Sequence, residues 1–514
     1  MIRRFFPALA AILVAASAFS LASAAEVFRS TPLMQEETRM VVSLLDEVHY
    51  LNHPVSDETF EQLITEFMSD LDQQRLFFTA ADEKAFRATY GPSMAHLLRQ
   101  EGSLDVAFRI FAVYKERAQA RIGWIKEELQ KDIDFTADEY YEFDRSEKPW
   151  PATLAEADDL WRKRIKFELI PDLLNDKTLD EARETVVKRY ERLLENLEEI
   201  EAPEVQELFL STLTRMYDPH STFFSAETLE DFSISMRLSL VGIGALLASE
   251  DGYCVIKELI PGGPASLSGQ LHPNDKIIAV QQEGEEPVDI IGMNLRKVVK
   301  MIRGKKGTPI TLTIVPADAA DTSTQKQLTL IRDIVQLNAG RATAEVHEVP
   351  GPNGTTMPIG VIDIPSFYGP VDEVTQPREL TASVSRDVEE LIEKLKARGV
   401  KGIILDLRRN GGGLLSEAVD LTGLFIPKGP VVIVRDSYGR YENRPDPDPR
   451  VAYDGPLMVL TSRYSASASE IVAGALQNYG RAIIVGDRST HGKGTVQAVL
   501  EMRDFLPRSI FTTG

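Results

Sequence analysis

Three serines and one lysine near the end of the sequence have the residue types that acyl-transfer chemistry uses. Ser465, Ser467 and Ser469 alternate with alanines at the start of an apolar segment with helical periodicity, and Lys493 lies between two glycines. A serine hydroxyl needs a base, and an amine can act as one when desolvation lowers its pKa towards neutrality. The start of a helix also favours a developing negative charge, so a Ser–Lys pair is a reasonable prediction.

The stretch around Lys493 permits two other interpretations, a phosphate-binding loop and a Ser–His pair. A strand over 483–485, then Gly486 and Gly492-Lys493, is similar to a phosphate-binding loop. That motif needs four residues between its glycines and a hydroxyl residue after the lysine. Five residues separate these glycines and Gly494 follows the lysine, which argues against nucleotide binding. A Ser–His pair that uses His491 stays open as an alternative.

A glycine-rich segment precedes these residues. Gly411, Gly412 and Gly413 follow the apolar strand pattern at 402–407. Successive glycines let backbone N–H groups turn towards an anion, as in an oxyanion hole or a phosphate cradle. A plain tight turn explains the same pattern equally well.

The elements that would position these residues form an α/β pattern after Thr356. Apolar strand patterns alternate with amphipathic helix patterns, which predicts helices packed against a largely parallel sheet. We expect the polar, proline-rich stretch 441–450 to be a loop. The predicted strands are 359–364, 402–407, 431–435 and 457–461, and the predicted helices are 385–397 and 415–424.

Two other regions precede this core. Residues 25 to about 215 have helical periodicity at 36–51, 57–71, 104–130 and 179–200, with possible capping boxes at Thr136-x-x-Glu139 and Thr178-x-x-Glu181. Residues 234–316 have short strand patterns at 239–241, 253–259, 276–280 and 310–315, with one helix pattern at 294–302. Such a length and content predict a small β-rich domain.

Composition narrows the possible partners and the compartment. The chain has 514 residues and a formal charge of −21, so nucleic acid is a poor partner. The only cysteine is Cys254, which excludes an intrachain disulfide and a thiolate zinc cluster. It lies in an apolar strand pattern, where we expect it to be buried.

The N-terminus has the pattern of an export signal. Two arginines precede an apolar run from Phe5 to Leu21, and Ala22-Ser23-Ala24 ends the run with small residues. Cleavage near Ala24 is predicted, and an uncut membrane anchor is the alternative. No later stretch is long and apolar enough to span a bilayer, so we expect a soluble exported protein.

The β-rich region resembles a PDZ domain, and the whole chain resembles the C-terminal processing, or tail-specific, proteases of peptidase family S41. The nearest branch is the periplasmic tail-specific one. The resemblance is carried by Leu71-Asp72-x-x-Arg75-Leu76-Phe77-Phe78, Asp218-Pro219-His220-Ser221, Leu240–Ala245, Ile364-Pro365-Ser366-Phe367-Tyr368, Asp406–Gly413, Ser465–Glu470 and Gly492-Lys493-Gly494-Thr495-Val496-Gln497.

The resemblance implies a multidomain α+β fold and a serine endopeptidase. It predicts a signal peptide at 1–24, an N-terminal helical domain at 25–215, an inserted PDZ domain at 228–318, and a protease core at 319–514 that includes 216–227. No cofactor or metal is implied. Implied partners are periplasmic proteins with unstructured, apolar C-termini, and a helical-repeat lipoprotein adaptor.

The resemblance also assigns roles to individual residues. Ser467 is the implied nucleophile, Lys493 its base and Gln497, one helical turn further on, the residue that orients the lysine. Ala468 and one of Gly411, Gly412 and Gly413 would supply the oxyanion hole. The tail-binding loop of the PDZ domain would be Val241, Gly242, Ile243, Gly244 and Ala245.

Two features depart from the family pattern. The loop from Gly486 to Lys493 is one residue longer than usual and has His491 where an aromatic residue is common. The family also continues beyond the point where this sequence ends at Gly514, which predicts a core without its C-terminal part. A catalytically inactive PDZ protein that binds tails, or an adaptor, is therefore the alternative function.

Overall fold

The protein is a multidomain α+β chain. Its structure, a computed structural model, describes residues 28–319, 321, 323–371 and 382–505. They fall into two compact units, one with 28–48, 53–223 and 500–505 and the other with 49–52 and 224–499. The predicted signal peptide at 1–24 lies outside the described residues. Within the described ranges, no helix combines the length and hydrophobicity needed to cross a bilayer.

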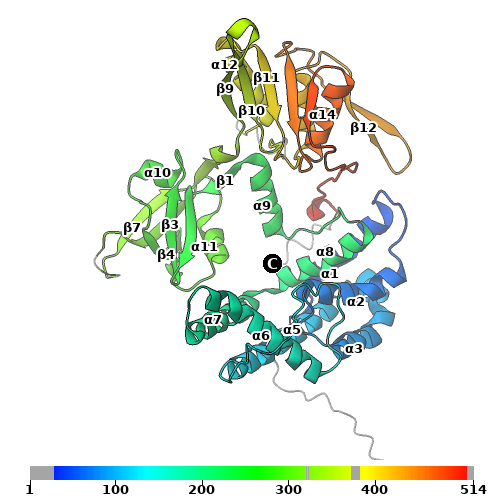
Figure 1. The fold of residues 1–514 in the computed structure, drawn as a ribbon, viewed down its shortest axis with the longest axis vertical. Helices are drawn as coiled ribbons and strands as arrows, with labels where there is room; N and C mark the ends of the chain where they lie inside the picture. The colour runs from blue at the N-terminus through cyan, green and yellow to red at the C-terminus, as the bar shows by residue number, and fades with distance from the viewer. Residues whose placement is uncertain (1–27, 320, 322, 372–381, 506–514) are drawn as a thin grey trace, which may run out of the picture. The chain divides into compact units, whose positions relative to one another are not determined.

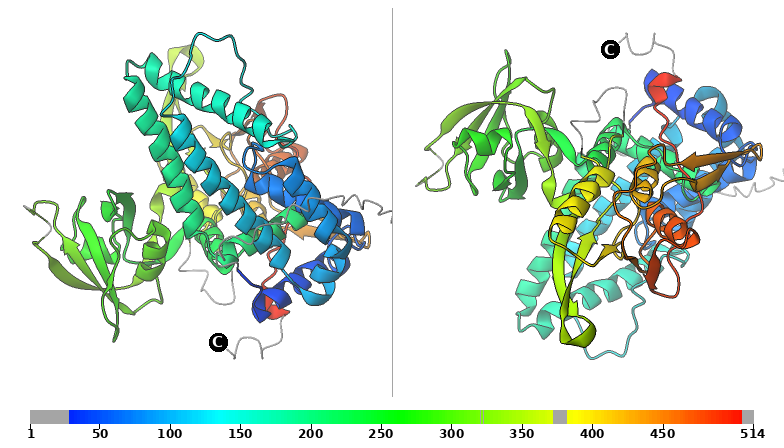
Figure 2. Two further views of the ribbon diagram at one scale, coloured as in Figure 1. Left: turned by 90° about the horizontal axis from the view of Figure 1, so that it is seen from below. Right: turned by 90° about the horizontal axis from the view of Figure 1, so that it is seen from above.

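The first unit is helical, as predicted. The long helices α5, α6 and α7 lie side by side within it (Figure 2). The predicted helix at 57–71 is confirmed with the same bounds, whereas α3, α6 and α8 were not predicted from the sequence. The helices are α1 Pro32–Glu47, α2 Asp57–Leu71, α3 Ala80–Tyr90, α4 Met94–His96, α5 Asp105–Glu128, α6 Leu154–Leu174, α7 Leu179–Glu199 and α8 Ala202–Tyr217, with short turns η1 Gly91–Ser93, η2 Leu97–Glu101 and η6 Met502–Asp504.

The two predicted capping boxes have different outcomes. Thr178 and Glu181 form the expected reciprocal bonds at the start of α7. The prediction at Thr136 is wrong, because no helix occurs between α5 and α6. The amide and hydroxyl of Thr136 instead donate to the Asp134 carboxylate, at 2.8 and 2.7 Å. A Thr-x-x-Glu pattern caps a helix only where apolar residues provide a face to bury.

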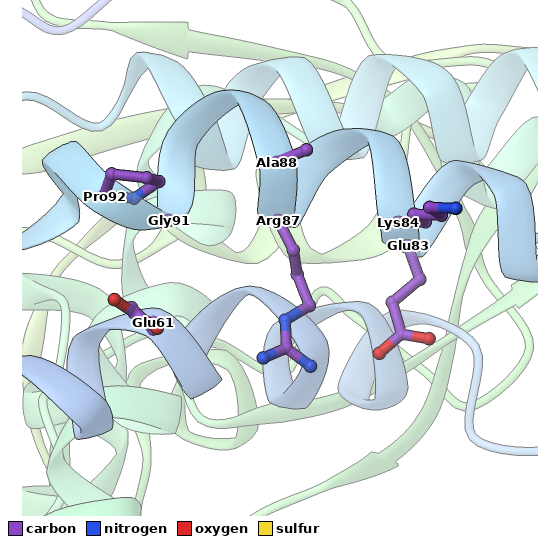
Figure 3. Close-up of a pocket in the computed structure, with 7 residues that line it drawn as sticks. All are labelled: Glu61, Glu83, Lys84, Arg87, Ala88, Gly91 and Pro92. Atoms are coloured by element: carbon purple, nitrogen blue, oxygen red, sulfur yellow. The ribbon is translucent and has the colours of Figure 1, made fainter.

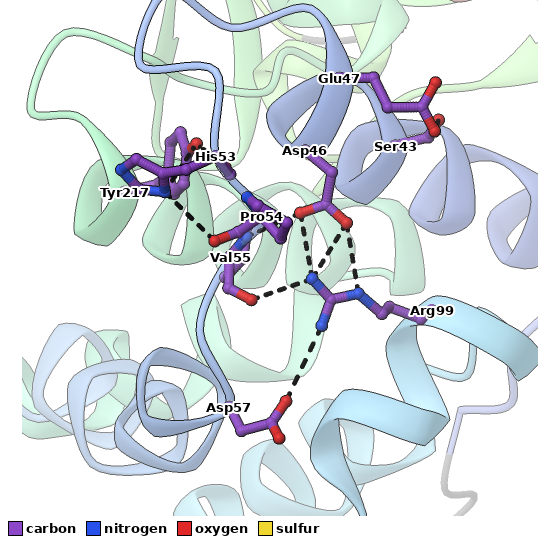
Figure 4. Close-up of polar contacts among 9 residues, drawn as sticks. All are labelled: Ser43, Asp46, Glu47, His53, Pro54, Val55, Asp57, Arg99 and Tyr217. Atoms are coloured by element: carbon purple, nitrogen blue, oxygen red, sulfur yellow. Dashed lines mark hydrogen bonds and ion pairs between the residues drawn. The ribbon is translucent and has the colours of Figure 1, made fainter.

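Polar side chains that are partly or fully buried join segments of this unit. The Arg99 guanidinium donates to both oxygens of Asp46 at the end of α1 and to the carbonyl of Val55 just before α2 (Figure 4). Asp72, which is 3% exposed, accepts from the amides of Leu76, Phe77 and Phe78. The Leu71–Phe78 motif therefore builds a turn in this unit.

The second unit contains a small β-rich domain. Its sheet, of which β3, β4 and β7 are labelled in Figure 1, has the order β2-β3-β4-β6-β7, with β5 paired to β4. β2 therefore lies at one edge. Asn274 has φ 72° in the turn before β4, a left-handed conformation that asparagine adopts more often than most other residues. The elements are α9 Ala226–Arg237, β1 Ser239–Gly242, β2 Ala245–Glu250, β3 Tyr253–Leu259, α10 Pro264–Ser268, β4 Lys276–Gln282, β5 Val288–Asp289, α11 Leu295–Ile302, β6 Pro309–Val315, β7 Lys326–Ile331 and β8 Asp333–Gln336.

Cys254 lies in β3 of this domain and is buried, as predicted. Burial raises the pKa of its thiol to about 11. Its thiolate is therefore scarce at neutral pH, which agrees with a packing role.

The α/β part of this unit has the predicted, largely parallel sheet. The order is β15-β14-β11-β10-β9, in which β10, β11, β14 and β15 are parallel and β9 is antiparallel. The loop predicted at 441–450 is wrong over Tyr441–Pro445, where the strand β13 pairs with β12 in a hairpin. The elements are η3 Asn338–Gly340, β9 Thr343–Pro350, η4 Pro352–Gly354, β10 Thr356–Asp363, α12 Val384–Ala397, β11 Gly402–Asp406, α13 Leu415–Gly423, β12 Pro430–Arg435, β13 Tyr441–Pro445, β14 Leu457–Thr461, α14 Ala468–Asn478 and β15 Ile483–Gly486.

Candidate active site

The three segments with candidate catalytic residues leave the same edge of the sheet. The glycine segment 411–413 follows β11, the serine turn 465–469 follows β14, and Lys493 follows β15. These strands are parallel neighbours, with β14 between the other two. Their carboxyl ends therefore place the three segments side by side, at the edge where open α/β sheets commonly bind ligands.

Ser467 has a backbone conformation that a serine rarely adopts. It precedes α14 with φ 56° and ψ −116°, in a turn closed by a hydrogen bond from Ser469 N to Ala466 O. Glycine is the residue that favours this region, and another residue there is strained by about 1–3 kcal/mol. Such strain persists only where surrounding contacts impose it, and it clusters at functional sites.

The two neighbouring serines have structural roles. The Ser465 hydroxyl donates to Leu407 O at 2.7 Å, and the Ser469 hydroxyl donates to Asn410 O at 2.9 Å. Both residues are fully buried, whereas Ser467 is half-buried. The serine turn is thereby fixed to the glycine segment, and Ser467 is the most accessible of the three serines.

Asn410 holds the glycine segment in place. It is fully buried, its amide donates to Ile364 O at 2.9 Å, and its side-chain oxygen accepts from Gly412 N at 2.8 Å. The Gly412 N–H is therefore already engaged. Gly411 and Gly413 remain as possible oxyanion donors beside Ala468, the first residue of α14.

Gly412 lies against the serine turn so closely that a side chain there has no room. Its φ is 111°, and an added Cβ would lie 2.8 Å from Ser467 Cβ and 3.0 Å from Ala466 O. We therefore expect Gly412→Ala to destabilise the core by about 1–3 kcal/mol through overpacking. Displacement of Ser467 should lower kcat/KM by about 100-fold.

Gly411→Ala is the matched control for that prediction, because an added Cβ at Gly411 would meet no atom within 4 Å. Its melting temperature (Tm) should equal that of the parent. Peptide-cleavage kinetics and thermal unfolding of both variants check the expectation. Equal Tm and kcat/KM for Gly412→Ala and the parent would contradict it.

Lys493 lies in a segment without regular structure. Residues 487–500 contain neither helix nor strand, and the Lys493 side chain is half-buried. Its backbone N–H donates to Glu470 Oε2 at 3.0 Å, and the same oxygen accepts from Ser467 N at 2.8 Å. The backbone amides of the predicted nucleophile and the predicted base therefore bond to the same carboxylate oxygen.

The remaining predicted residues of this loop are placed differently. Gln497 is exposed and its amide donates to Thr495 Oγ1 at 3.1 Å. Because no helix connects 493 to 497, their spacing does not place them on one helical face, and within the described residues no hydrogen bond joins them. His491 is also exposed, with its backbone N–H on Ser465 O.

Glu470 belongs to this site, although the sequence alone predicted no role for it. Its carboxylate accepts from Ser467 N, Lys493 N, Gly492 N and the hydroxyl of Thr490. Burial acts to raise the pKa of Glu470, but these hydrogen bonds outweigh it and hold the pKa below its usual value. The Ser467-x-x-Glu470 pattern matches a capping box, which was the signal that could have identified it.

A buried glutamate, Glu417, joins the starts of the two helices α12 and α13. Glu417 lies in the first turn of α13, and its Oε2 accepts from the hydroxyls of Ser383 and Ser385 and from Ser385 N. The start of α13 is thus joined to the start of α12. Burial raises the pKa of Glu417.

The predicted tail-binding loop lies at the start of β2. β1 ends at Gly242 and β2 begins at Ala245, so Ile243 and Gly244 connect two strands, with Val241 inside β1. The carbonyls of Ile243 and Gly244 accept from Ala265 N and Ile260 N. These contacts fix the loop beside the open edge of β2, the place where an extended peptide could add as a strand.

A surface pocket in the helical unit has a different character. It lies between α2 and α3, where Glu83 and Arg87 extend from α3 towards α2, and Glu61 extends from α2 (Figure 3). This mixture of opposite charges contains no serine and no nucleophile–base pair. It offers no alternative catalytic centre.

Comparison with known proteins places three family models along the chain. Residues 41–227 match the tail specific protease N-terminal domain, residues 232–315 match the PDZ domain, and residues 358–511 match peptidase family S41.

Individual relatives agree with these matches. The chain is 38% identical over 472 residues to the tail-specific protease of Haemophilus influenzae, covering 91% of this chain and 65% of that protein. It is 31% identical over 343 residues to the carboxyl-terminal-processing protease of Synechocystis, covering 65% of this chain and 71% of that protein. A solved PDZ domain of a carboxy-terminal protease from Vibrio cholerae, in complex with peptide, is 45% identical, covers 20% of this chain and all of that one, and has a TM-score of 0.19.

This chain therefore spans just under two thirds of the length of the H. influenzae relative. The three family models match successive parts of one sequence, and the Synechocystis relative is covered over most of its own length. The chain belongs to the tail-specific, or carboxyl-terminal processing, protease family, which combines a PDZ domain with a peptidase of family S41.

Proposed function

We propose that this chain is a serine endopeptidase with Ser467 as nucleophile and Lys493 as general base. The observation that carries the proposal is the strained turn at Ser467, which holds a half-buried serine at the start of α14 and against the glycine segment. A nucleophile on a strained turn before a helix is a recurrent arrangement in serine hydrolases. Family membership supports the same chemistry.

The proposed reaction uses groups that the three segments bring together. The neutral amine of Lys493 accepts the proton of the Ser467 hydroxyl as Oγ attacks the peptide carbonyl carbon. The ammonium returns a proton to the leaving amine, and water then hydrolyses the acyl-serine by the same route. Backbone N–H groups of Ala468 and of Gly411 or Gly413 hold the oxyanion, where the N-terminal end of α14 also favours negative charge.

Gln497 remains the proposed orienting residue for Lys493. Both residues lie in the segment 487–500, which has neither helix nor strand, and the support for this role is the resemblance of the Gly492–Gln497 motif. A Ser–His pair with His491 is the weaker candidate, because the His491 side chain is exposed and only its backbone is held at the serine turn.

The PDZ domain is the proposed site for the C-terminus of a protein substrate. The open edge of β2 can pair with an extended chain, and the backbone N–H groups of Val241–Ala245 are suited to a terminal carboxylate. The V. cholerae domain was solved with a peptide, which supports peptide binding here. We propose that substrate tails are apolar and unstructured.

The remaining parts of the proposal concern location and organisation. Export to the periplasm, after cleavage near Ala24, is proposed from the N-terminal pattern and from the tail-specific relative. We propose a helical domain at 25–215, a PDZ domain at 228–318 and a protease core at 319–514 that includes 216–227. The helical domain is the proposed docking site of a helical-repeat lipoprotein adaptor. The relatives reported above are all named as proteases, so they give no support to the inactive alternative.

A pair of substrates tests tail recognition. A small protein that ends in an unstructured, apolar tail should be degraded by the purified chain, because that tail binds the PDZ domain. The same protein with two aspartates added at its C-terminus should be cleaved at least about tenfold more slowly, since charge resists transfer to an apolar groove. Gel and mass-spectrometric time courses measure both, and Ser467→Ala controls for contaminating proteases.

The two negative outcomes of this experiment have different meanings. Equal cleavage of both substrates would contradict tail recognition while leaving the endopeptidase intact. Absence of cleavage of either substrate would contradict the endopeptidase itself.

A further inference from the structure

The Glu470 carboxylate connects two parts of the site that are separated in the sequence, the serine turn and the loop at 487–500 that contains Lys493 (the lysine loop). One oxygen, Oε2, accepts from Ser467 N at 2.8 Å and from Lys493 N at 3.0 Å. The other, Oε1, accepts from the hydroxyl of Thr490 at 2.7 Å and from Gly492 N. One side chain thus bonds to the strained serine and to three residues of the lysine loop.

The lysine loop has few other attachments. It has no regular secondary structure, and most of its side chains are exposed. Asp487 accepts from Arg463 N at the beginning of the loop, and His491 N donates to Ser465 O in its middle. At Lys493 itself, the bond to Glu470 is the only one found within the described residues. The position of the base therefore depends on Glu470 more than on any other side chain.

We propose that Glu470 is the positioning residue that sets the distance between the Ser467 nucleophile and the Lys493 base. This inference rests on the proposed serine-peptidase function. A carboxylate suits the task because it only accepts hydrogen bonds and each of its oxygens can take two, so it can hold four donors from two segments at once. Its negative charge also strengthens each hydrogen bond and is favoured by the dipole at the N-terminal end of α14.

A simple helix cap would use only part of this geometry. A capping glutamate needs only the N-cap amide, here Ser467 N. The bonds to Thr490, Gly492 and Lys493 add nothing to such a cap, since these residues lie outside α14. They are explained if the carboxylate also holds the base loop.

Replacement of Glu470 by glutamine tests the proposal. Glutamine keeps the size but replaces one accepting oxygen by an NH₂ donor, so one of the two pairs of donors loses its partner. We expect kcat to fall about 100-fold, the effect of a displacement of roughly 1 Å, while KM changes less than about twofold because the tail-binding site is separate. The rise of activity with pH should also shift, because the base has a new environment.

Glu181→Gln is the matched control. Glu181 occupies the same third position of a capping box, at the start of α7, where among the described residues its carboxylate has hydrogen bonds only with Thr178. This variant should keep the kcat and pH profile of the parent. Thr490→Val, which removes one of the four donors, should give a loss between those of the two glutamine variants.

Hydrogen–deuterium exchange separates failure of this proposal from failure of the proposed function. In Glu470→Gln, the amides of Ser467, Gly492 and Lys493 should exchange at least about tenfold faster, whether or not the parent cleaves peptides. Unchanged exchange, or a kcat equal to that of the parent, would overturn the positioning role. A loss of kcat in equal proportion in Glu181→Gln would also overturn it, because helix capping alone would then account for the loss.

Discussion

With alanine in place of Ser467, cleavage of an apolar-tailed substrate is expected to fall by about 10⁴-fold or more. The reason is the loss of the only half-buried hydroxyl in the serine turn, since those of Ser465 and Ser469 are buried and bonded to backbone carbonyls. Tail binding should persist because the PDZ domain is unchanged. Steady-state cleavage and peptide-binding titrations on the same preparation measure the two properties.

Two variants make this expectation specific. Ser467→Gly should be equally inactive but more stable than Ser467→Ala by about 1 kcal/mol, because glycine adopts φ 56° without strain. Ser469→Ala should retain the nucleophile and lose stability, because Asn410 O loses its hydroxyl partner. Cleavage by Ser467→Ala at the rate of the parent would show that another residue is the nucleophile.

Lys493→Ala is expected to lower kcat by about 10³-fold, within the usual contribution of a general base. The variant should also lose the rise in activity that we expect of the parent from neutral to mildly alkaline pH, because only a deprotonated amine accepts the serine proton. Measurement of kcat/KM from pH 6 to 9, at about one-unit steps, checks both effects.

The titration of Glu470 does not account for such a rise. Because the pKa of Glu470 lies below its usual value, the stabilisation that this carboxylate provides is present at neutral pH and is lost only as the pH falls through the lowered pKa. Its effect is therefore confined to acid. His491→Ala is the matched control, since it changes a neighbour in the same loop and should keep the alkaline rise. A flat profile for the parent, or an unchanged profile for Lys493→Ala, would contradict a lysine base.

Much of the fold could be predicted because its signals are local. The apolar strand β11, the amphipathic helix α12 and the Thr178 capping box depend on residues within one element, and the structure confirms them. The sequence motifs identified the family, because a motif depends on residue identity alone.

The wrong predictions share a physical cause, because in each case contacts outside the local sequence pattern decided the structure. Thr136 has the pattern of a cap, but its amide and hydroxyl bind Asp134 and no helix follows. β13 is polar and exposed, so its strand character comes from pairing with β12 and not from its own side chains. The helical spacing assumed for Gln497 fails because nothing in 487–500 provides a face that packs as a helix.

The sequence by itself determined the family, the order of the domains and the residue types available for catalysis, because these follow from composition, periodicity and motifs. Only the tertiary structure decided which serine is strained and accessible, that the Gly412 N–H is already bonded, and that Glu470 joins the serine turn to the lysine loop. These facts depend on hydrogen bonds between segments that follow different strands. Such bonds form only when the parallel sheet brings the carboxyl ends of β11, β14 and β15 to one edge.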